Sequence, residues 1–170
     1  MEIIYVFLSA FCFFLVLVFL LTYYKKNRAE KMLKIFDAEK LNKIEIGFSE
    51  VSYSSFRQNG GISSKATLYY NERLLIFTPK KNSVFSSILN SLPLILILKT
   101  DNKLPREFNY KIIDKIIIKT DEFILSFSEN TLTTKMRKEI TVFSEKENPK
   151  LNEIFTKFSE NKILTSKILN

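Results

Sequence analysis

The sequence predicts one membrane-spanning helix followed by a small α+β domain, in which about seven antiparallel strands form a meander or partly open barrel closed by a C-terminal helix. Three observations support this fold class. The stretch from Ile3 to Tyr24 is apolar and uncharged, residues 62–144 alternate between apolar and polar with short turns, and a helical apolar pattern follows Pro149. The expected organisation is an anchor at 1–24, a juxtamembrane helix and linker at 25–58, and the barrel domain at 59–170.

The N-terminal stretch has the length of an uncleaved membrane anchor. A helix of about 22 residues is about 33 Å long, which is enough to cross a hydrocarbon core of about 30 Å. A cleaved signal peptide begins with basic residues and ends at a small-x-small site. Here only Glu2 is charged before the stretch, which ends in Leu-Leu-Thr-Tyr-Tyr. A lipoprotein reading through Cys12 fails because the bulky Phe11 stands where a small residue is needed.

Basic residues flank this stretch on one side only. Because such residues stay on the cytoplasmic side, we expect a single-pass protein of the cytoplasmic (inner) membrane with its N-terminus outside and its domain in the cytoplasm. The same residues are candidates for binding anionic lipid headgroups, although a topology signal alone would also explain them. They are Lys25, Lys26, Arg28, Lys31 and Lys34.

The composition of the 170-residue chain excludes several chemistries. It carries 26 basic and 18 acidic residues, a net charge of +8, which suits an anionic membrane, although solvated lysines alone would also explain it. Nucleic acid is not an expected partner, because the aromatic residues alternate with aliphatic ones at core positions. There is no histidine, and the single cysteine, Cys12, lies in the anchor. Zinc sites, histidine-activated nucleophiles, cofactors and enzymatic activity are therefore not expected.

The anchor helix is expected to continue to about Leu41. Ala29, Met32, Leu33 and Phe36 are spaced i, i+3, i+4 and i+7, so they form one apolar stripe. This stripe has three candidate partners, which are the lipid surface, the chain's own domain and a second copy of the chain.

The segment from 42 to 58 contains one short strand pattern. Ile44, Ile46 and Phe48 alternate with polar residues. The sequence Asn59-Gly60-Gly61 then predicts a break in the chain.

Successive short strands with short turns predict the meander. Residues 65–70 and 73–78 form its first hairpin, with a turn at Asn71-Glu72 that asparagine favours because it tolerates positive φ. A longer connection at 80–92 follows. The remaining strands are expected at 94–98, 106–110 (weak), 112–119, 123–127 and 134–144.

The C-terminal pattern is that of a capped amphipathic helix. Asn148 suits the N-cap and Pro149 the first helical position, and the helix is expected to end or kink near Asn161. Its apolar face is expected to plug one end of the barrel. The face consists of Leu151, Ile154, Phe155 and Phe158.

Residues 62–160 resemble the pleckstrin-homology-like fold, in particular its bacterial PH and GRAM-like members. The resemblance rests on the segments ATLYYNERLLIFTPKK, YKIIDKIIIK, EFILSFSEN and KEITVFSEKENPKLNEIFTKF. It implies a binding or scaffolding module, which in eukaryotes often binds phosphoinositides. The long basic loop between the first two strands that marks lipid-binding members is here the short turn Asn71-Glu72, so no lipid-site residue is carried over.

The expected function is a membrane-tethered binding or scaffolding module without catalysis. A second set of candidate ligand-binding residues, near the ends of the first hairpin, is Arg73, Lys80 and Lys81, for which ordinary solvated side chains are the alternative. The expected partners are the lipid bilayer, anionic lipid headgroups, and a protein partner or a homo-oligomer. The alternative functions are a structural subunit that self-associates or docks on a membrane complex, and a lipid-headgroup sensor.

Overall fold

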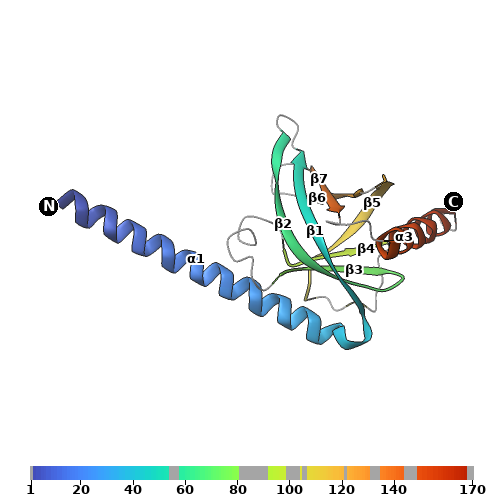
Figure 1. The fold of residues 1–170 in the computed structure, drawn as a ribbon, viewed down its shortest axis with the longest axis horizontal. Coiled ribbons are helices and arrows are strands. Elements are labelled where there is room, and N and C mark those ends of the chain that lie inside the picture. The colour runs from blue at the N-terminus through green and yellow to red at the C-terminus, as the bar shows by residue number, and fades with distance from the viewer. Residues whose placement is uncertain are drawn as a thin grey trace.

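The structure is a computed structural model that describes residues 2–53, 58–80, 92–98, 104, 107–120, 122–130, 135–143 and 149–167. It confirms the fold class: a long apolar helix, a closed seven-strand barrel and a C-terminal helix (Figure 1). The elements are α1 (Glu2–Ile35), the 3₁₀ turn η1 (Ala38–Lys40), β1 (Asn42–Tyr53), β2 (Gln58–Tyr70), β3 (Leu74–Pro79), β4 (Leu94–Ile97), β5 (Tyr110–Ile118), β6 (Glu122–Asn130), β7 (Lys135–Phe143) and α3 (Pro149–Lys167).

Helix α1 is one unbroken helix of 34 residues. Within the part of the chain that is described, it is the one helix long and apolar enough to cross a membrane, and its most apolar stretch has a mean hydropathy of 2.9. The helix ends at Ile35 and not near Leu41, because Asp37 takes a left-handed conformation with φ 50° that terminates it.

The C-terminal part of α1 packs on the outside of the barrel. Met32 is only 1% exposed and belongs to a cluster with Ile76 of β3 and Ile95 of β4. The ring of Phe36 lies 6.0 Å from that of Phe108. Of the three partners considered for the apolar stripe, the chain's own domain is therefore the one that it contacts.

The observed barrel differs from the expected meander in two ways. It is closed and not partly open, since β1 and β7 pair antiparallel. It is also not purely antiparallel, because β4 and β5 run parallel, with Ile95 beside Tyr110. Residues 107–109 form a turn and bend, so the strand expected at 106–110 is not formed there and β5 starts at Tyr110.

The closing seam between β1 and β7 depends on a glycine. Gly47 lies directly opposite Phe143. A Cβ atom at Gly47 would stand 2.2 Å from the Phe143 ring, so a larger residue there would force the ring away.

The barrel begins at Asn42, before the expected boundary at residue 59. Strand β1 is longer than the predicted pattern at 44–48, and it pairs with both β2 and β7. The expected linker thus supplies a barrel strand.

The break expected at Asn59-Gly60-Gly61 is instead a bulge inside β2. The register shifts between Glu50 and Ser52 of β1, where Gly60 and Gly61 face the single residue Val51. Glycines commonly mark such bulges, which bend a strand without ending it.

The turn between β2 and β3 forms as expected but for a different reason. The side-chain oxygen of Asn71 accepts hydrogen bonds from the backbone N–H groups of Arg73 (2.9 Å) and Leu74 (3.0 Å). Among the described non-glycine residues only Asp37 has positive φ, so Asn71 acts through its side chain.

Helix α3 plugs one end of the barrel, as predicted. Phe155 is fully buried and stacks on Phe123 of β6, with ring centres 4.4 Å apart. The helix does not stop at Asn161 but continues to Lys167. The amide of Asn161 instead donates a hydrogen bond to the carbonyl oxygen of Glu72. The buried face of α3 is Leu151, Ile154, Phe155 and Phe158.

Candidate functional site

The juxtamembrane basic residues divide into two groups. Lys31 pairs with Glu107 of the barrel (2.7 Å), and Lys25 is half-buried. The others make no contact with the barrel and are exposed on the last turns of α1, where Lys26 pairs with Glu30 of the same helix (3.9 Å), and they are Lys26, Arg28 and Lys34.

The charge of Lys25 shows how the barrel is oriented on α1. Lys25 directly follows the apolar stretch, and its ammonium interacts electrostatically with Glu50 of β1. Strand β1 begins near the end of α1 and so runs back along it, as Figure 1 shows. The barrel end that contains Glu50 is therefore level with the end of the apolar stretch, and the α3 end is farther away.

The second candidate set is not one site. Arg73 and Lys80 flank β3 at its two ends, about 20 Å apart along the strand. Arg73 is exposed, whereas Lys80 pairs with Glu45 (2.5 Å). Lys81 lies outside the described residues.

The barrel interior holds a group of charged side chains that the sequence pattern did not predict. Ion pairs join neighbouring strands in the order β1, β7, β6 and β5, with distances of 3.1 Å, 3.0 Å and 2.5 Å. We call these side chains the ion-pair cluster, and they are Glu50, Lys138, Glu129 and Lys111.

The ion-pair cluster continues the interior face of the strands. Glu50 follows the core residue Phe48 by two positions, and Glu129 follows Phe127 by two. Because side chains of a strand alternate between faces, these carboxylates point into the barrel. The side chain of Glu50 is only 7% exposed. The signal in the sequence was a charge at an inward position of a period-two pattern.

Burial and pairing act in opposite directions on these charges. Burial raises the pKa of Glu129, but hydrogen bonds and the charges of Lys111 and Lys138 outweigh it, so the pKa falls below its ordinary value. Burial lowers the pKa of Lys138, but Glu50 and Glu129 outweigh it, so this pKa is raised. Two acids and two bases balance, which is the arrangement of a structural ion network.

Metal ligands do not gather anywhere in the described ranges. Among these residues, no group of three or more histidine, cysteine, aspartate or glutamate side chains is placed to hold a metal ion.

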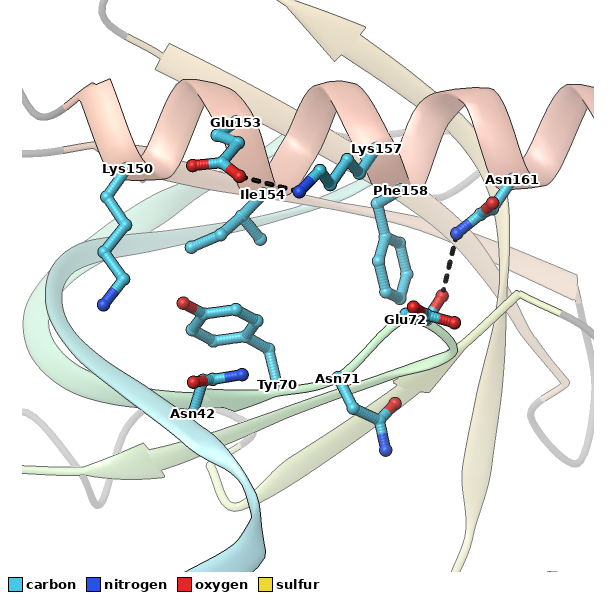
Figure 2. A pocket seen from close by; sticks show the side chains of 10 residues that line it. All are labelled: Asn42, Tyr70, Asn71, Glu72, Lys150, Glu153, Ile154, Lys157, Phe158 and Asn161. Carbon is cyan, nitrogen blue, oxygen red and sulfur yellow. Dashed lines mark hydrogen bonds and ion pairs between the residues drawn. The ribbon is translucent and has the colours of Figure 1, made fainter.

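A cleft of about 390 Å³ lies between α3 and the turn that joins β2 to β3 (Figure 2). Tyr70 from β2 faces Ile154 and Phe158 of α3 across it. On the rim, Glu153 and Lys157 form an ion pair of 2.7 Å. The volume is within the range of small-molecule sites, so this cleft is a candidate ligand site of the barrel. No local sequence pattern indicates this cleft, because its walls are far apart in the chain.

Comparisons of the chain with protein-family models, with curated proteins and with solved structures found no match.

Proposed function

We propose that this protein is a single-pass membrane protein whose PH-like barrel works as a binding or scaffolding module on the cytoplasmic face, without catalysis. The observation that carries the proposal is the continuity of α1. The same helix that is long and apolar enough to span a bilayer packs on the barrel through Met32. The barrel is thus fixed to its anchor without a flexible linker, as a module that presents a surface at the membrane requires.

The position of Lys25 supports a barrel that sits directly at the headgroups. This residue follows the apolar stretch and interacts with Glu50, so little of α1 separates span and barrel. The exposed Lys26, Arg28 and Lys34 lie on the same turns of α1, within about 15 Å of the end of the apolar stretch. Their attraction to an anionic leaflet orients the domain toward the cytoplasm and holds it against the surface.

The membrane contact is tested with residues 25–170 sedimented with vesicles. The fragment should bind phosphatidylglycerol vesicles at low salt and dissociate from them at about 0.5 M salt. It should not bind phosphatidylcholine vesicles. Replacing Lys26, Arg28 and Lys34 with Gln should abolish this binding. The matched control replaces three exposed basic residues of the barrel with Gln, namely Lys43, Arg73 and Lys115. If both variants lose vesicle binding equally, the net charge of the protein, and not the position of these three residues, determines the binding. Salt-resistant binding to one phosphorylated headgroup would favour a lipid sensor.

The topology and the scaffolding role are tested in cells. Alkaline phosphatase fused after Asn170 should be inactive, since it works only outside the cytoplasm. Crosslinking of the full chain should mainly join it to a different protein. An active fusion would overturn the orientation, and a homo-oligomer as the main product would favour the structural-subunit alternative.

A further inference from the structure

We propose that the barrel end opposite α3 is a second membrane-contact surface, which lies in the headgroup layer of the bilayer. We call this surface the hairpin end, and it consists of residues 51–53 of β1 and residues 137–139 of β7, which pair side by side. The inference rests on the proposed function for the bilayer around α1. It adds a contact made by the barrel itself to the one made by the exposed basic residues of that helix.

Strand β1 reaches the level at which the apolar stretch of α1 ends. Lys25, which directly follows that stretch, interacts electrostatically with Glu50 of β1. The strand does not end there but continues to Tyr53, about 10 Å farther along. Because β1 runs back along α1, as Figure 1 shows, its last residues lie farther toward the bilayer than Glu50 does.

The covered face of α1 extends into the apolar stretch. Met32 and Ala29 are buried, and Lys25 is half-buried. Toward the N-terminus the same face continues with Thr22 and Val18, because all five residues are spaced three or four apart. Of residues 4–24, these two are the ones that are not exposed. A bilayer that surrounds the apolar stretch must therefore meet the folded domain on this side of α1.

The sequence around the hairpin end is free of acidic residues. Residues 51–62, which include the connection from β1 to β2, contain one basic and no acidic residue, and so do residues 130–136, which include the connection from β6 to β7. The turns at the α3 end are different, because they contain Glu72 and the pair Asp121-Glu122. An anionic leaflet therefore attracts the hairpin end and repels the turns beside α3.

The side chains at the hairpin end suit a membrane interface. Tyr53 lies opposite Arg137, and both aromatic and arginine side chains are favoured where an apolar body meets a polar headgroup. The carboxylate on this surface, that of Glu139, is hydrogen-bonded to Tyr53 and pairs with Arg137 at 2.8 Å. Its charge is thus compensated within the protein and does not oppose an anionic surface.

Single tryptophans test the contact, because the chain contains no tryptophan of its own. The full chain is placed in phosphatidylglycerol nanodiscs whose lipids are brominated close to the headgroup and quench nearby tryptophan. Phe14→Trp marks the apolar stretch, and Thr156→Trp marks the exposed side of α3. Lys43→Trp and Tyr53→Trp mark the two ends of β1. Tyr53→Trp should lose emission and shift it to shorter wavelength, whereas Lys43→Trp and Thr156→Trp should do neither.

A further probe keeps the test independent of one substitution. Val51→Trp should be quenched more than Lys43→Trp and less than Tyr53→Trp, because the strand approaches the bilayer. If Phe14→Trp is quenched but neither probe at the hairpin end is, the inference is overturned and the proposed function stands. If Phe14→Trp is not quenched either, α1 does not lie in the bilayer and both fail. Equal quenching of Thr156→Trp and Tyr53→Trp would place another face of the barrel on the membrane and would also overturn the inference.

Discussion

The two ends of the barrel close their interior with opposite chemistry. At one end α3 inserts an apolar face, and Phe155 stacks on Phe123 with an angle of 20° between the rings. Toward the other end the interior contains the ion-pair cluster of Glu50, Lys111, Glu129 and Lys138. The apolar end is the one away from the apolar stretch of α1, whereas the charged end lies level with Lys25, which follows that stretch.

This difference separates two sources of stability. Burying an apolar ring is favourable in any register and at any pH, because the hydrophobic effect has no direction. Burying charges costs desolvation free energy that only well-placed partners offset, so ion pairs add less stability but penalise a wrong strand register. We infer that α3 supplies stability and that the ion-pair cluster fixes how β5, β6, β7 and β1 align at the barrel end opposite α3.

The largest effect is expected at the apolar end. Phe155→Ala should lower the free energy of unfolding by about 3–5 kcal/mol, because it removes a fully buried ring and leaves a cavity. Urea denaturation of residues 25–170 measures this. A matched control is Thr156→Ala, on the exposed side of the same helix, which should change little. A loss below about 1 kcal/mol for Phe155→Ala would place the ring outside the core.

The next effect is expected at the charged end. Lys138→Met should cost about 2–3 kcal/mol, because it removes the shared partner of Glu50 and Glu129. The cost is below that of a fully buried pair, since Glu129 keeps Lys111 and the Lys138 side chain is 17% exposed. Adding Glu50→Leu should restore part of the loss. A double variant that is less stable than the sum of the single ones would contradict an ion network.

The sequence predicts the apolar end far better than the charged end. The helical spacing from Leu151 to Phe158 is local, so it reveals both the helix and its buried face. Glu50 is different, because residues 42–58 look like a linker until β1 is seen to pair with two strands. Extending the alternation of Ile46 and Phe48 by one step would have placed Glu50 inside.

Other features depend on contacts that no local pattern encodes. Strands β4 and β5 pair in parallel, and the spacing of apolar residues along a strand does not give its direction. The cleft arises where Tyr70 of β2 meets Lys150 of α3, which are distant in the sequence. The sequence pattern therefore predicts elements and faces, but neither the closure of the barrel nor the position of this cleft.

A smaller effect is expected when pH is varied. Glu129 has a lowered pKa in the folded protein, so its stabilisation is present above the unfolded glutamate pKa of about 4.3 and is lost as pH falls through the folded value. Lys138 has a raised pKa, so its stabilisation is present below about 10.4 and is lost as pH rises through the folded value.

The dependence of stability on pH below pH 6 tests the contribution of Glu129. Between pH 6 and pH 3 the urea midpoint of Glu129→Gln should fall less than that of the wild type. Phe155→Ala should start lower but fall with the wild-type slope, because it removes no titrating group. If the slopes of Glu129→Gln and the wild type coincide, the carboxylate is not stabilised by its partners.

The smallest effect is expected for an ion pair of the same two residue types that lies on the surface of α3 and not in the barrel interior. Glu153 and Lys157 form a lysine–glutamate pair at 2.7 Å, shorter than the 3.1 Å between Lys138 and Glu50. Their side chains, however, are 63% and 68% exposed on the surface of α3, where water and salt screen the attraction. Lys157→Gln should therefore leave the urea midpoint unmoved within error, although Lys138→Gln shifts it clearly. A midpoint shift for Lys157→Gln as large as that for Lys138→Gln would show that burial does not strengthen these pairs, and would remove the physical distinction between exposed and buried ion pairs in this protein.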